Sequence, residues 1–175
     1  MGLLGELIAT DQRRTLEFFF LGLRDLCDET VDCRELLYNA SILAHYAQVS
    51  TGAADDVPAP PDLGAVFDSF VLDTTPQGDR VLMEAAGAQC LLLAGFFEDQ
   101  MRHRHNLRWY AGLGASYFKR AAALHGAGTE HARLLGTLAR HFEPWRQRHA
   151  RLSRELRDQA YLLALPALPP SARAA

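Results

Sequence analysis

The sequence is poor in the features that mark several classes of protein. Three cysteines in 175 residues exclude a scaffold built on disulfide bonds, so the fold must depend on a hydrophobic core. The longest apolar run, residues 90–97, is about half of the roughly 18 residues that a membrane-spanning helix needs. No basic segment precedes an apolar stretch near the start, as a secretory signal requires. We therefore expect a cytoplasmic protein with no membrane partner.

Alternation of apolar and polar residues with a period of two is almost absent, which argues against β-sheets. Apolar residues recur instead with helical spacing, and 49% hydrophobic against 22% charged residues is ordinary for a folded domain. The sequence predicts a single all-α domain, a bundle of five to seven helices over residues 1–160. A loop rich in proline, glycine and alanine is expected at residues 50–62, and an extended or frayed tail at residues 161–175.

Two of the expected helices have distinctive patterns. Residues 77–104 predict a long helix whose middle, residues 85–97, is apolar on most sides, which is typical of a buried central helix. The last helix has apolar residues at alternating spacings of three and four, a heptad-like seam that Pro144 should bend or divide. If the seam faces a partner or a second copy of the chain, the candidate interface residues are Leu138, Phe142, Trp145, His149, Leu152 and Leu156.

The net charge of −3 conceals a strong asymmetry along the chain. Residues 1–99 contain 17 acidic residues and 5 arginines (5 − 17 = −12), and residues 100–175 contain 4 acidic and 13 basic residues (13 − 4 = +9). In one interpretation, acidic helices pack beside basic ones and the two fields cancel within the fold. In the other, the acidic segment of one copy pairs with the basic segment of another, which predicts salt-sensitive association.

Seven histidines and many carboxylates raise the question of a metal site. The Glu-x-x-His spacing of bundle di-metal proteins and the His-Glu-x-x-His spacing of zinc proteases are both absent. A site assembled from distant residues remains as an alternative, with candidate ligands His45, Glu98, His103, His131 and His141. In this alternative the chain is a metal or haem protein, with oxidoreductase activity as one role. No motif for an activated nucleophile is present, so we predict no catalytic residue and no cofactor.

The stretch of residues 101–110, MRHRHNLRWY, combines arginines with aromatic side chains. Such a combination can contact phosphates and stack on bases, which makes nucleic-acid binding a third hypothesis. The candidate binding residues are Arg102, Arg104, Arg108, Trp109 and Tyr110. The same composition is typical of a solvated helix end whose aromatic residues turn into the core, and we favour this simpler interpretation.

Residues 87–122 contain an apolar segment ending in Gly-Phe-Phe, then arginine-rich residues, then a tyrosine-containing segment. This stretch resembles uncharacterised all-helical proteins found in proteobacteria. The resemblance implies a bacterial helical domain and assigns no activity and no site. The leading hypothesis is a non-enzymatic interaction or regulatory protein that binds a protein partner or a second copy of itself.

Overall fold

The computed structural model describes residues 2–52, 63–73 and 75–158, and every regular element in these ranges is helical. The prediction of an all-α fold is confirmed. The α-helices are α1 (Gly2–Arg24), α2 (Cys33–Gly52), α3 (Leu63–Phe67), α4 (Arg80–Leu91), α5 (Glu98–Met101), α6 (Leu107–His125), α7 (Glu130–Arg140) and α8 (Phe142–Asp158). Three single turns complete the set: the π-helical η1 (Asp68–Leu72) and η3 (Leu92–Phe96) and the 3₁₀ turn η2 (Thr75–Gly78).

These ranges contain eight α-helices rather than five to seven. The difference arises because the expected central helix is divided into α4 and α5 and the expected last helix into α7 and α8. The expected loop at residues 50–62 begins later than predicted, since α2 continues to Gly52. Residues 53–62 of that loop and the expected tail at residues 161–175 lie outside the described residues.

Side-chain caps explain where three of the helices begin. The carboxylate of Asp79 accepts hydrogen bonds from the backbone N–H groups of Val81 and Leu82 at the start of α4, at 2.8 and 3.2 Å. Asn106 and Thr129 play the same part for α6 and α7. Each cap pairs backbone donors that the first turn of a helix leaves unsatisfied.

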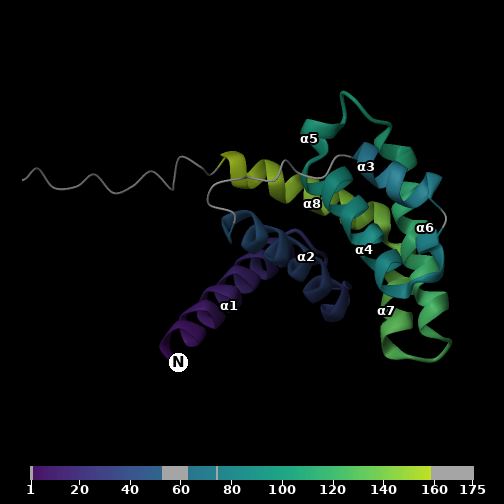
Figure 1. Cartoon of the computed structure of the whole chain (residues 1–175). Coiled ribbons are helices and arrows are strands. Elements are labelled where there is room, and N and C mark those ends of the chain that lie inside the picture. The colour runs from purple at the N-terminus through teal and green to yellow at the C-terminus, as the bar shows by residue number, and fades with distance from the viewer. Residues whose placement is uncertain (1, 53–62, 74, 159–175) are drawn as a thin grey trace, which may run out of the picture.

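The helices form two groups that α8 connects (Figure 1). The helices α1 and α2 lie side by side, while α4, α6 and α7 pack together on the other side of the molecule. The last helix, α8, contacts members of both groups and packs on the π-helical turn η3. The expected central helix corresponds to α4, η3 and α5 in succession. Within its predicted apolar middle, residues 85–97, residues 90–95 are buried, whereas Ala85 is exposed.

The break in the last predicted helix does not lie at Pro144. Helix α7 ends at Arg140, with His141 as its cap, and α8 begins at Phe142. Pro144 therefore occupies the first turn of α8, where a missing N–H removes no hydrogen bond and the fixed φ suits the helix. No helix in the described part of the chain is long and apolar enough to cross a membrane.

Ion pairs join the acidic first part of the chain to its basic second part. Glu98 on α5 pairs with Arg146 at 2.7 Å and with Arg154 at 3.7 Å, and Asp99 pairs with Arg157. Arg34 on α2 pairs with Glu130 on α7 at 3.5 Å. In this pair the basic residue belongs to the first part of the chain and the acidic residue to the second. Part of the charge asymmetry is therefore compensated within the chain itself, as in the first of the two interpretations of the sequence.

Candidate metal centre

The α6–α7 hairpin places two histidines on the same side of a tight turn. His125 is the last residue of α6 and His131 is the second residue of α7. The turn between them uses Gly126 and Gly128 at φ +89° and +104°, a conformation that residues with a Cβ rarely adopt. The two imidazole rings meet edge to face with their centroids 4.6 Å apart.

Glu84 on α4 completes a cluster with these histidines. Its Oε2 atom lies 2.8 Å from Nε2 of His131 and 3.6 Å from Nε2 of His125. One ligand atom from each residue lies within 4.8 Å of the other two. The other carboxylate oxygen, Oε1, accepts a hydrogen bond of 2.8 Å from the Tyr38 hydroxyl on α2. Four helices therefore converge on this cluster.

The Nε2 atom of His125 is buried and has no hydrogen-bond partner in the part of the chain that the structure describes. Its distance of 3.6 Å from Glu84 is longer than a hydrogen bond. Leaving a buried polar atom unsatisfied costs about 1–3 kcal/mol. A cation between the three residues would accept the lone pair of this nitrogen and remove that cost.

The cluster has the chemistry of a transition-metal site. Ligands bound at about 2.1 Å in a tetrahedral arrangement lie about 3.4 Å apart, which the separations of 2.8 and 3.6 Å around Glu84 bracket. Two imidazoles and one carboxylate suit Zn²⁺, Fe²⁺ or Co²⁺. Three protein ligands also leave at least one coordination position for water or another molecule.

Two hollows adjoin the cluster and give access to it. An apolar hollow of about 570 Å³ between α2 and α4 has Glu84 in its wall, and a second of about 690 Å³ has His131 in its wall. Tyr38 and Ser41 line both hollows. The cluster thus lies where two concave surfaces meet, with the His131 side chain 43% exposed.

Of the metal ligands suggested by the sequence, only His131 belongs to this cluster. His45 is exposed on α2, Glu98 is paired with Arg146, His103 is exposed after α5, and His141 lies against Glu35. Among the described residues, Glu84, His125 and His131 form the one group of three with suitable ligand atoms. Sequence reasoning missed Glu84 and His125, although a histidine on each side of a glycine turn was a usable signal.

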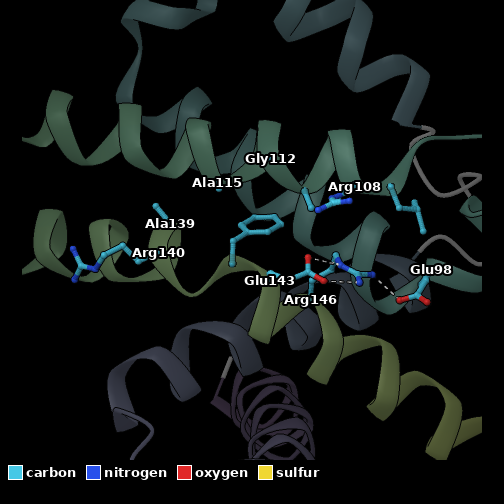
Figure 2. A pocket seen from close by; sticks show the side chains of 11 residues that line it. Glu98, Arg108, Gly112, Ala115, Ala139, Arg140, Glu143 and Arg146 are labelled. Atoms are coloured by element: carbon cyan, nitrogen blue, oxygen red, sulfur yellow. Dashed lines mark hydrogen bonds and ion pairs between the residues drawn. The ribbon is translucent and has the colours of Figure 1, made fainter.

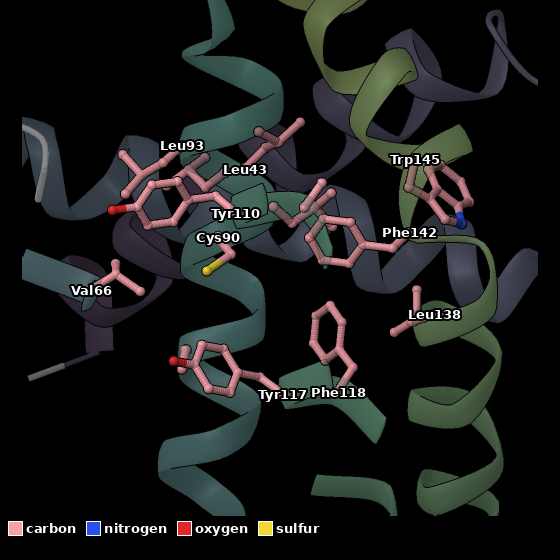
Figure 3. Packing of buried hydrophobic residues seen from close by; sticks show 14 of the residues in the cluster. Leu43, Val66, Cys90, Leu93, Tyr110, Tyr117, Phe118, Leu138, Phe142 and Trp145 are labelled. Carbon is pink, nitrogen blue, oxygen red and sulfur yellow. The ribbon is translucent and has the colours of Figure 1, made fainter. Parts of the chain in front are cut away.

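The heptad-like seam of the sequence is part of the core of the chain itself (Figure 3). Trp145 and His149 are fully buried, and Leu138, Phe142 and Leu152 nearly so, while Leu156 is partly buried. These side chains pack against other helices of the same chain. Apart from Leu156, the seam residues are therefore not exposed on the surface of the single chain.

A buried carboxylate fixes the junction between α7 and α8. Glu35 on α2 accepts a hydrogen bond of 2.8 Å from Nε1 of Trp145 and lies 3.1 Å from Nδ1 of His141. One helix turn further along α2, Oδ1 of Asn39 lies 2.9 Å from Nε2 of His149. These contacts join α2 to the α7–α8 junction and to α8, so we assign them a structural role.

The candidate nucleic-acid-binding residues differ in their exposure, and the Trp109 side chain is 42% exposed. Tyr110 is buried, and Trp109 packs against Tyr110 and against Phe67 with ring centroids 4.9 and 5.7 Å apart. Arg102 and Arg104 are exposed near the end of α5. Arg108 instead lines a hollow between α6, α7 and α8.

No protein-family model, curated protein or solved structure matches this chain.

Proposed function

We propose that this chain is a helical metal-binding protein that holds one divalent transition-metal ion between Glu84, His125 and His131. The observation that carries the proposal is the convergence of three ligand atoms from α4, α6 and α7 within 4.8 Å. The unsatisfied Nε2 atom of His125 supports it independently.

Tyr38 is the positioning residue of this centre. Its hydroxyl donates to Oε1 of Glu84, which directs Oε2 toward the two histidines. Burial raises the pKa of Tyr38 well above its usual value, and the negative charge of Glu84 raises it further. The hydroxyl is therefore a stable donor at neutral pH, and such partners orient metal ligands and increase their affinity.

Titration with Zn²⁺ or Co²⁺ tests the proposal. We expect the wild-type protein to bind one equivalent, measured by calorimetry and by native mass spectrometry. His125→Ala and Glu84→Gln should each weaken binding by at least about 100-fold, because even partners that only orient ligands contribute about 10–100-fold. Tyr38→Phe should weaken it by about tenfold for the same reason. Co²⁺ should give a visible absorption spectrum that these variants lose.

A matched control is His103→Ala, which removes an exposed histidine outside the cluster. This variant should bind the metal as the wild type does. Stoichiometric binding that survives His125→Ala and Glu84→Gln would place the ion elsewhere and overturn the proposal. Binding should also weaken as the pH falls, because protons compete with the metal ion for its ligands.

A second candidate function is the binding of a protein partner or a second copy of the chain. It is favoured by Phe18 and Leu21, one turn apart on α1, which are 55% and 39% exposed. We expect light scattering to report a dimer that Phe18→Ser with Leu21→Ser converts to a monomer. Val49→Ser, which changes an exposed apolar residue on α2, is the control. A wild-type monomer at low and high salt would contradict self-association.

A further inference from the structure

Two hollows between α6 and α7 join into one groove that lies apart from the metal cluster. The larger, of about 680 Å³, and the smaller, of about 430 Å³, share Ala115, Ala139 and Arg140 in their walls. The groove exists because the facing side chains are too small to fill the space between the two helices. A Cβ atom added at Gly112 would meet nothing within 4 Å.

The larger hollow has a mainly apolar surface, and its Arg146 is paired with two carboxylates. Its surface includes Phe142 and Leu107 together with several alanines. Figure 2 shows Arg146 beside Glu143 and Glu98 within this hollow. Arg146 donates to Glu143 at 2.8 and 2.9 Å and to Glu98 at 2.7 Å, so these charges already have partners.

The smaller hollow is positively charged. Two cations line it, Lys119 from α6 and Arg140 from α7, and its wall contains no carboxylate. Neither cation has a carboxylate within 4.0 Å among the residues with described positions. The Arg140 guanidinium donates to Oγ1 of Thr137 at 3.0 Å, which holds it on the α7 side of the groove. Figure 2 shows Arg140 and Arg108 toward opposite ends of the larger hollow.

We propose that this groove binds a small amphipathic anion, a carboxylate or phosphate attached to an apolar body. The anionic group lies between Lys119 and Arg140, where it receives charge-assisted hydrogen bonds. The apolar body lies in the larger hollow, against Phe142 and the alanines of α6. An inorganic anion would leave this apolar surface in water, and an uncharged molecule would leave the two cations without a partner.

Dodecanoate below its micellar concentration is the probe that tests this proposal. We expect one molecule to bind per chain in calorimetry, more weakly as salt is added. Lys119→Gln with Arg140→Gln should weaken binding by at least about tenfold, since one charged hydrogen bond contributes about that much. Gly112→Leu should weaken binding by filling the larger hollow, with an unchanged circular dichroism spectrum.

Three comparisons distinguish the alternatives. Dodecanol and dodecyltrimethylammonium have the same apolar body with no charge or the opposite charge, and either one binding as well as dodecanoate would overturn the proposal. If acetate binds as tightly as dodecanoate, the groove is a simple anion site, and the proposal is also overturned. Arg133→Gln, a change on α7 away from both hollows, should leave binding unchanged. His125→Ala should also leave it unchanged, since the groove does not depend on the metal.

Discussion

Lowering the pH from 6.5 to 5 should destabilise the native protein by about 2 kcal/mol through His149 alone. Complete burial lowers the pKa of His149 from 6.5 to about 3, and a shift of one unit corresponds to about 1.4 kcal/mol. In this window the unfolded chain binds a proton at this residue and the folded chain does not. The free energy of unfolding therefore decreases as the pH is lowered. The loss continues toward pH 3, where the folded protein also becomes protonated, and reaches the order of 5 kcal/mol.

The geometry around His149 explains why the imidazole stays neutral. Its Nε2 atom lies 2.9 Å from Oδ1 of Asn39, so this nitrogen donates its proton. The other nitrogen, Nδ1, is buried with no hydrogen-bond partner in the described structure. A second proton would therefore add an unpaired donor and a charge to the core, both of which are unfavourable.

Urea unfolding at a series of pH values measures this effect. His149→Gln retains a donor for Asn39 and does not titrate, so its stability should change less than that of the wild type between pH 6.5 and 5. The difference between the two proteins isolates His149 from carboxylates such as Glu143, whose hydrogen bond from Arg146 lowers its pKa. Parallel stability curves for the two proteins would contradict the prediction.

The second large effect is expected at Gly114 on α6. A Cβ atom there would lie 2.5 Å from Cζ of Phe142 and 2.7 Å from Cβ of Cys90, so α6 would have to move away from α4 and α8. Gly114→Ala should therefore destabilise the protein by about 2–3 kcal/mol, the usual cost of adding atoms to a packed core. Thermal and denaturant unfolding give the value.

Gly112 provides a control on the same helix for the same substitution. A Cβ atom at this position meets nothing within 4 Å, so Gly112→Ala should stabilise the protein by about 0.5–1 kcal/mol through helix propensity. The two variants should thus move the free energy of unfolding in opposite directions. Equal effects at both positions would mean that α6 does not approach α4 and α8 this closely.

The longer helices could be predicted because helical periodicity is local. The seam of the last helix was identified correctly as an apolar face, and residues such as Trp145 and Leu152 are indeed buried. Periodicity does not reveal what covers such a face, and here the cover is the chain itself. Periodicity also did not reveal the π-helical turn η3, which separates α4 from α5 within the expected central helix.

The metal cluster shows a different limit of sequence reasoning. Spacings of three or four residues reveal pairs of metal ligands that lie on one helix. His125 and His131 come together across a turn, and Glu84 approaches from another helix, so no local spacing connects the three. The predicted break at Pro144 was wrong for another reason. A proline in the first turn of a helix and a proline that breaks a helix look alike in a sequence.

The contacts of Glu35 also bear on the order in which the chain folds. Its partners His141 and Trp145 lie 106 and 110 positions further along the chain. The α6–α7 hairpin needs only neighbouring residues and can form at once, whereas contacts between such distant positions form slowly. During synthesis, Glu35 cannot form these contacts until α8 has been made. We therefore expect the direction of α8 relative to α7 to be set late in folding, after α8 has been synthesised.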